Sequence, residues 1–230
     1  MKSDKSLSLD DPANLESWLS SEVYRQNVDF WERAWNMVKA AYTQMPEISY
    51  LPSIPEGLTR AGARSLLDLG CGSGWLSVYL ARQGFSVTGV DISTHAVQLA
   101  KDWAAREGLD IHFEVGDIAN LSYPPGVFDA VVANSIFEHL THELARVTLA
   151  RLKHLLAPGG AFVGCFDKVG GGPGEYYELS DHTHVYTDKG RKGMMLRYFG
   201  DDELKALFSD WTIYDFSTMD NGTRVVWART

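Results

Sequence analysis

The chain has few cysteines, no long apolar run and no excess of positive charge. Its 230 residues include two cysteines, Cys71 and Cys165, which are too few for a disulfide framework and indicate reduced, structural thiols. No stretch approaches the roughly 20 apolar residues that cross a bilayer, and the N-terminus is polar where a signal peptide needs an apolar run. These absences predict a cytoplasmic protein with no membrane partner.

The charge balance argues against a polyanionic partner. The formal net charge is −9 at pH 7, with 30 acidic residues against 21 basic ones. A protein that binds nucleic acid by neutralising phosphates needs clustered Lys and Arg, so we expect no nucleic acid among its partners. The composition gives no indication of the oligomeric state.

Short β-rich runs alternate with amphipathic helical patterns from Arg64 to Gly160, which is typical of βαβ units and a parallel sheet. The patterns predict strands at 64–69, 85–90, 111–115, 128–134 and 161–166, and helices at 75–83, 95–107 and 138–156. Two more β-rich runs flank Asp220-Asn221-Gly222, a strong hairpin signal. The expected fold is α/β: a Rossmann-like, doubly wound, mostly parallel seven-stranded sheet ending in an antiparallel hairpin.

The segments outside this alternation are expected to cover the sheet. Residues 1–60 are predicted to form a helical cover and a linker: Leu15 to Tyr42 has a helical, aromatic-rich pattern, and three prolines follow it. Residues 61–230 are expected to form the main domain. Within it, a glycine-rich stretch starting at Val169 introduces residues 168–200, which are expected to be a loop or lid on the substrate side.

A glycine-rich turn follows the first expected strand. Residues 66–74, Leu-Leu-Asp-Leu-Gly-Cys-Gly-Ser-Gly, place an acidic residue at the strand end and three glycines in the turn, where the backbone can approach a ligand closely. The third glycine comes one place earlier than in the dinucleotide pattern G-x-G-x-x-G, and Trp75 takes the expected position. Asp68 disfavours a pyrophosphate and favours an ammonium-bearing ligand. Asp91 ends the second strand, where a carboxylate can accept hydrogen bonds from ribose hydroxyls.

Four further segments follow this turn in order: Val-Thr-Gly-Val-Asp-Ile-Ser at 87–93, Gly-Asp-Ile at 116–118, Phe-Asp-Ala-Val-Val-Ala-Asn at 128–134 and Leu-Ala-Pro-Gly-Gly at 156–160. Together they resemble the class I S-adenosylmethionine-dependent methyltransferases, most closely the small-molecule branch, over about residues 64–166. The resemblance implies S-adenosyl-L-methionine as cofactor. It also implies methyl transfer to a small-molecule acceptor by in-line displacement, with O- or N-methylation favoured.

The resemblance assigns ten positions to the cofactor. They are Asp68, Gly70, Cys71, Gly72 and Gly74 for the methionine end, Asp91 for the ribose, Ile92, Asp117 and Ile118 for the adenine, and Asn134 near the reactive centre. In-line positioning of the acceptor lowers much of the barrier to methyl transfer. A base is needed only where the acceptor is protonated at neutral pH.

His139 follows the fourth expected strand on the side where an acceptor should arrive, and an imidazole is suited to take a proton from a hydroxyl. A cap or surface role is the alternative for this residue. Further candidates for substrate contact are Glu138, Tyr176, Tyr177, His182, His184 and Tyr186. The two histidines of the last group have no third ligand at metal spacing, so no metal site is expected.

Competing functions stay open on the sequence. A catalytically silent module that binds S-adenosylmethionine and acts as a partner subunit would keep the same glycines and carboxylates. An NAD-type oxidoreductase is disfavoured by Asp68, by Trp75 and by the expected final hairpin. A nucleic-acid methyltransferase acting on exocyclic amines is disfavoured because residues 134–137, Asn-Ser-Ile-Phe, lack two expected prolines.

Overall fold

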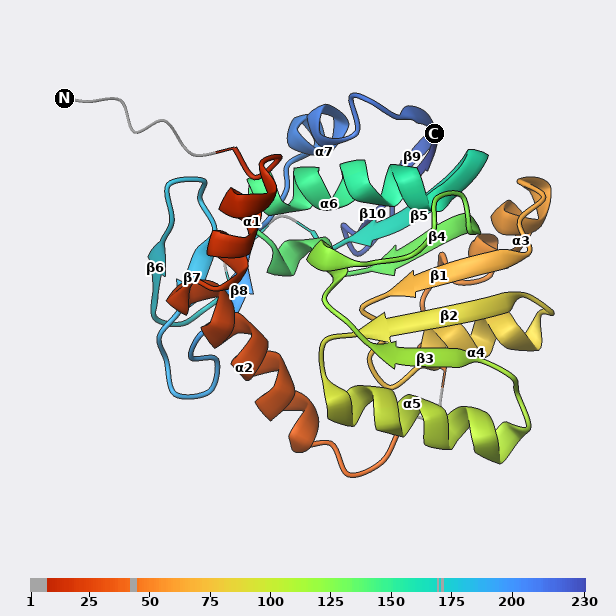
Figure 1. The fold of residues 1–230 in the computed structure, drawn as a ribbon, viewed down its shortest axis with the longest axis horizontal. Coiled ribbons are helices and arrows are strands. Elements are labelled where there is room, and N and C mark those ends of the chain that lie inside the picture. The colour runs from red at the N-terminus through yellow and green to blue at the C-terminus, as the bar shows by residue number, and fades with distance from the viewer. Residues whose placement is uncertain (1–7, 42–44, 169, 171) are drawn as a thin grey trace.

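A seven-stranded sheet forms the centre of the computed structural model, which describes residues 8–41, 45–168, 170 and 172–230. Its order is β3 (His112–Val115), β2 (Ser86–Asp91), β1 (Ser65–Leu69), β4 (Phe128–Asn134), β5 (Leu156–Phe166), β10 (Arg224–Arg229) and β9 (Thr212–Thr218) (Figure 1). The first five strands are parallel, and β10 pairs antiparallel with both β5 and β9. The predicted fold is confirmed.

Helices cover both faces of the sheet because the central strands are apolar on both faces. In β4, Val131 and Ala133 pack toward α6 (His142–Leu155) and α7 (Asp201–Leu207). The alternate residues Ala130 and Val132 pack toward α3 (Ser53–Arg60) and α4 (Trp75–Arg82), and α5 (Thr94–Glu107) lies beside α4. This period of two follows from the pleat of a strand. No helix in the described part of the chain is long and apolar enough to cross a bilayer.

The N-terminal region differs from the expected single helix. Two helices, α1 (Pro12–Leu19) and α2 (Glu22–Asn36), replace it, because the Ser21 hydroxyl accepts a hydrogen bond from the backbone N–H of Tyr24 at 3.2 Å and starts a new helix. Tyr42, the expected helix end, lies outside the described residues. Figure 1 shows α2 crossing the carboxyl ends of the parallel strands, so this helix covers the sheet edge as predicted.

Three further boundaries correct the prediction. The expected linker contains α3, whose Ile54 and Leu58 are buried against the sheet, so this part of it is core. The helix expected to begin at Glu138 begins at His142, because a 3₁₀ turn, η2 (Phe137–His139), comes first and Thr141 caps α6. Strand β5 begins at Leu156, five residues earlier than expected.

Residues 168–200, expected to be a loop or lid, contain a second sheet. Its three antiparallel strands are β6 (Tyr176–Glu178), β7 (His184–Tyr186) and β8 (Met195–Leu196). Val169, where the glycine-rich stretch was expected to start, lies outside the described residues. Figure 1 shows this small sheet beside α1 and α2, at the same end of the molecule. The segment therefore has regular structure next to the carboxyl edge of the main sheet.

Candidate active site

A cavity of about 180 Å³ lies between α2 and the carboxyl ends of the parallel strands. Open α/β sheets bind their ligands at this edge. The wall from α2 consists of Tyr24, Asn27, Val28, Trp31 and Trp35. The opposite wall consists of Gly70, Asp91, Ile92, Asp117, Ile118, Ser135, Ile136, His139 and Leu140.

The turn after β1 has a backbone that glycine permits. Gly70, Gly72 and Gly74 all have positive φ values, of 62°, 53° and 86°, in the left-handed region that other residues rarely adopt. A Cβ atom at Gly72 would lie 2.6 Å from the ring of Trp35. Glycine therefore serves two purposes in this turn. It permits the left-handed backbone, and at Gly72 it leaves room for Trp35 of α2.

Asp91 is fixed at the end of β2 and lines the cavity. Its Oδ2 accepts a hydrogen bond from the backbone N–H of Gly72 at 2.9 Å, and its Oδ1 accepts one from that of Ser93 at 2.9 Å. Burial raises the pKa of Asp91, and these two N–H donors oppose that rise. A carboxylate has lone pairs beyond these two bonds, so Asp91 can also accept from ligand hydroxyls.

Asp68 lies beneath the turn and is not among the residues that line the cavity. Its Oδ2 accepts a hydrogen bond from the Ser77 hydroxyl at 2.6 Å, and the side chain is 2% exposed. Burial raises the pKa of Asp68 to about 7. The carboxyl group thus ties the end of β1 to α4.

Asp117 follows β3 and is held by α2. Its Oδ1 accepts a hydrogen bond from the backbone N–H of Ala119 at 2.9 Å, and both its oxygens accept from the Tyr24 hydroxyl, at 2.8 and 2.9 Å. Burial raises the pKa of Asp117 and raises that of Tyr24 well above its usual range. Ile92 and Ile118 line the cavity beside this pair. The Tyr24 contact is absent from the sequence prediction.

His139 lines the same cavity, at the end of η2. Its Nδ1 lies 3.0 Å from the backbone carbonyl of Met195, and its ring centroid lies 4.4 Å from that of Trp31. A carbonyl only accepts hydrogen bonds, so Nδ1 carries the proton and Nε2 is the acceptor of the neutral ring. Burial lowers the pKa of His139, which keeps the imidazole neutral at neutral pH.

Glu138 and Asn134 lie behind the cavity wall. The Oε1 of Glu138 accepts a hydrogen bond from the backbone N–H of Asp167 at 2.5 Å, and burial raises the pKa of this carboxyl to about 7. Asn134 accepts a hydrogen bond from the Tyr50 hydroxyl at 2.7 Å. Ser135 and Ile136, which the sequence prediction missed, line the cavity in place of Asn134.

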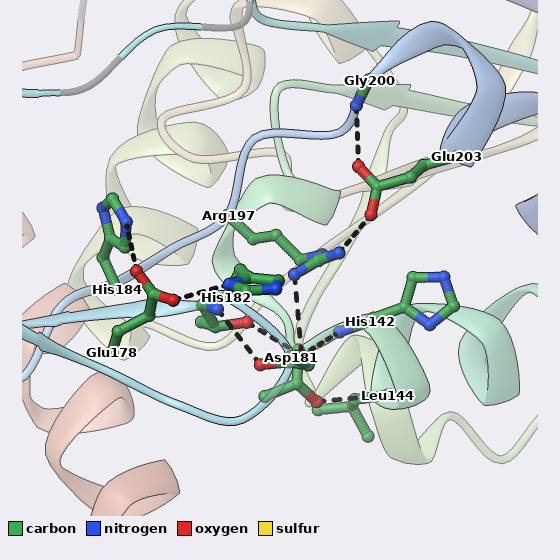
Figure 2. A network of polar contacts seen from close by, with 11 residues as sticks. His142, Leu144, Glu178, Asp181, His182, His184, Arg197, Gly200 and Glu203 are labelled. Carbon is green, nitrogen blue, oxygen red and sulfur yellow. Dashed lines mark hydrogen bonds and ion pairs between the residues drawn. The ribbon is translucent and has the colours of Figure 1, made fainter.

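The remaining candidates for substrate contact are not among the residues that line this cavity. Tyr176, Tyr177, His184 and Tyr186 lie on the second sheet, and His182 lies in the connection between β6 and β7. Figure 2 shows Glu178 between His182 and His184, and Asp181 accepting a hydrogen bond from the backbone N–H of His142 at 2.8 Å. These contacts join the small sheet to the start of α6. Within the described ranges, no three His, Cys, Asp or Glu side chains are arranged to hold a metal ion.

The chemistry of the cavity fits a cationic adenine nucleoside. Its lining combines two carboxylates with apolar isoleucines and includes no Lys or Arg. A dinucleotide would bring a pyrophosphate to this acidic edge, which is unfavourable. Asp91 and Asp117 offer carboxylate oxygens that can accept hydrogen bonds, and Ile92 and Ile118 offer apolar surface.

This sheet, its final hairpin and the acidic glycine turn resemble those of the class I S-adenosylmethionine-dependent methyltransferases. The family model described as "Methyltransferase domain" matches residues 66–160. The match contains the turn after β1 together with Asp91 and Asp117.

Two curated relatives are similar to this chain over about half of its length. The 2-heptyl-1-hydroxyquinolin-4(1H)-one methyltransferase of Mycobacteroides abscessus is 32% identical over 126 residues, which are 54% of this chain and 54% of the relative. The ubiquinone biosynthesis O-methyltransferase of Xylella fastidiosa is 35% identical over 111 residues, which are 48% of this chain and 44% of the relative. The chain spans about half the length of the curated relatives it matches.

A solved structure shares the fold over most of the chain. It is the 1,6-didemethyltoxoflavin-N1-methyltransferase of Burkholderia thailandensis, with bound 1,6-didemethyltoxoflavin and S-adenosylhomocysteine. The two chains are 21% identical, with a TM-score of 0.63 over 95% of this chain and 90% of that one. The likeness shows a common fold that extends beyond the residues matched by the family model.

Proposed function

We propose that this protein transfers the methyl group of S-adenosylmethionine to a hydroxyl group of a small, largely apolar molecule, with His139 as the general base. The observation that carries the proposal is the orientation of His139. Its Nδ1 faces the Met195 carbonyl at 3.0 Å, which directs the basic Nε2 away from that bond in a ring that lines the cofactor cavity. Nucleic acid is not the acceptor we expect.

The residues at the strand ends hold the cofactor. Asp91 takes the ribose hydroxyls, Asp117 takes the adenine amine, and Ile92 and Ile118 enclose the base. The turn at Gly70–Gly74 approaches the methionine end through its backbone. When bound, S-adenosylmethionine supplies an electrophilic methyl group on its sulfonium.

His139 removes the proton that the acceptor loses. As the acceptor oxygen forms its bond to the methyl carbon, the carbon–sulfur bond breaks and the hydroxyl proton moves to Nε2. The products are the methylated acceptor and S-adenosylhomocysteine. The lowered pKa of His139 keeps the base unprotonated at neutral pH, which a general base requires. The α2 helix covers the cavity and excludes water from the transfer.

The walls around His139 favour an apolar ring as acceptor. Val28, Trp31, Ile136 and Leu140 line the cavity near the imidazole, and apolar walls with few polar groups are typical of small-molecule sites. Two relatives support oxygen as the methylated atom, since one is named for a hydroxyquinolinone and the other is named an O-methyltransferase. The expected acceptor is therefore a hydroxylated aromatic compound.

A panel of hydroxylated aromatic compounds, incubated with protein and S-adenosylmethionine, tests this proposal through the formation of S-adenosylhomocysteine. With an acceptor in hand, His139→Gln should lower kcat about 10²-fold and leave the cofactor Kd from calorimetry nearly unchanged. His154→Gln is the matched control, because His154 is exposed on α6. It should leave both constants at their original values.

The outcomes separate the competing functions. Cofactor binding without turnover on any acceptor supports a silent binding module that acts as a partner subunit. Normal turnover by His139→Gln shows that positioning alone carries the reaction. Loss of cofactor affinity in His139→Gln shows that this residue contacts the cofactor and that the base assignment is wrong.

A further inference from the structure

Asn27 is a buried polar residue on a helix face whose other members are mostly apolar. The residues of α2 that line the cavity are Tyr24, Asn27, Val28, Trp31 and Trp35, which follow the spacing of one helical face. Asn27 is 5% exposed. Burying an amide among such neighbours is unfavourable unless its groups find partners. Its partners therefore indicate why it is there.

Both polar groups of the Asn27 amide form hydrogen bonds. One bond is made to His139 directly, and the other is made to Met195, which itself contacts His139. The Nδ2 donates to the backbone carbonyl of His139 at 3.3 Å, and the Oδ1 accepts from the backbone N–H of Met195 at 2.9 Å. The carbonyl of that same Met195 faces the His139 Nδ1 at 3.0 Å. The three contacts close a ring through α2, η2 and β8.

We infer that Asn27 is a positioning residue that fixes the place and the tautomer of the His139 imidazole. This inference rests on the proposed function of His139. One arm of the amide holds the backbone carbonyl of His139, and the other holds the backbone N–H of Met195, the residue whose carbonyl accepts the imidazole proton. Each arm needs a different chemical group, one donor and one acceptor, which asparagine supplies on a short side chain.

The three contacts also connect His139 to the helix and the small sheet beside the cavity. Met195 lies in β8, which pairs with β7 of the small sheet, and Asn27 lies in the helix that closes the cavity. The three contacts that set the Nδ1–H tautomer therefore form only when α2, η2 and β8 are assembled together. A base held in this way is pre-organised for proton transfer.

The test uses nitrogen NMR of the imidazole. In full-length protein labelled with ¹⁵N-histidine, the His139 signals are assigned among seven histidines by comparison with His139→Gln. The original protein should show His139 with the proton on Nδ1. Asn27→Leu, which has a similar size and neither polar group, should show a mixture of the two tautomers, and its kcat should fall about 10-fold or more with the cofactor Kd nearly unchanged.

Asn36→Leu is the matched control, since Asn36 is exposed at the last position of the same helix. It should change neither the tautomer nor kcat. If Asn27→Leu does not fold, Asn27→Asp serves, because its carboxylate keeps the bond from Met195 and loses the donor to the His139 carbonyl. Asn27→Asp should keep the tautomer and lower kcat.

The inference is overturned if folded Asn27→Leu keeps the Nδ1–H tautomer with unchanged kcat, or if Asn27→Asp turns over normally. These results differ from a failure of the proposed function. There, His139→Gln would turn over normally, while the NMR experiment would still report whether Asn27 sets the tautomer.

Discussion

The buried carboxyl group of Glu138 should make the stability of the protein depend on pH. Glu138 is 1% exposed, and its Oε2 has no hydrogen-bond partner in the described part of the chain. Burial raises its pKa from an ordinary 4.5 to about 7, so the folded state binds this proton more tightly than the unfolded chain does. The resulting stability is complete below pH 4.5 and is lost as the pH rises through 7, because an ionised Glu138 is poorly accommodated.

Glu138→Gln removes this ionisation and keeps a carbonyl to accept from the backbone N–H of Asp167. A pKa displaced from 4.5 to about 7 corresponds to roughly 3 kcal/mol of stability at pH 8. The unfolding free energy of Glu138→Gln, relative to the original protein, should therefore rise by about 2–3 kcal/mol from pH 5 to pH 8, since a small part of the effect is already present at pH 5.

Urea unfolding followed by tryptophan fluorescence at pH 5, 6, 7 and 8 measures this difference. Glu56→Gln is the control, because Glu56 has a side chain that is 70% exposed on α3. Its difference from the original protein should stay flat over the same range. A difference for Glu138→Gln that is equally flat would refute the argument from burial.

Two further substitutions probe the cofactor edge. Asp91→Ala should weaken S-adenosylmethionine binding by about 1–3 kcal/mol in calorimetry, because ligand hydroxyls lose their acceptor, and unchanged affinity would contradict the ribose assignment. Gly74→Ala should lower the unfolding free energy by about 1–3 kcal/mol in urea, because φ is 86° and the new Cβ would lie 2.8 Å from the Cβ of Ala100. Gly84→Ala, with a φ of 90° but open space around the new Cβ, separates backbone strain from this steric overlap.

The sheet and its carboxylates could be predicted because their signals are local. The β4 segment, Phe128–Asn134, is continuous and apolar, which is typical of a strand buried on both faces, and its bounds agree with the structure. Asp91 comes at the end of a recognisable strand, and parallel strands bring their carboxyl ends to one edge. For a residue at the end of a parallel strand, the sequence alone therefore predicts that it lies at the carboxyl edge of the sheet.

The sequence predicted that the N-terminal helical region covers the sheet, but it did not predict which of its residues contact the site. Tyr24 contacts Asp117, and Asn27 contacts His139 and Met195, across more than ninety residues of chain in each case. No local pattern specifies such partners. The one available signal was Asn27 itself, a polar residue on a helix face shared with tyrosine, valine and tryptophan.

Other errors have local causes. The prolines interpreted as a linker include Pro52 at the start of α3 and Pro55 in its first turn, where proline is tolerated because the N–H groups there have no helical partner. Strands β6, β7 and β8 have only two or three residues each, too few for an alternating pattern to be recognised. Tyr176, Tyr177, His184 and Tyr186 lie on this small sheet, and His182 lies between β6 and β7. Their contact with a substrate stays a prediction.

The helix that closes the cavity has a consequence for how such a protein diversifies. The cofactor half of the cavity lies within residues 66–160, which match the family model, while α2 and β8 lie before and after them. If the proposed function holds, exchange of the N-terminal helices between relatives is expected to change the acceptor and to leave Asp91 and Asp117 in place. Chimaeras joined near residue 64 and residue 166 would separate the segment that matches the family model from the segments on either side of it.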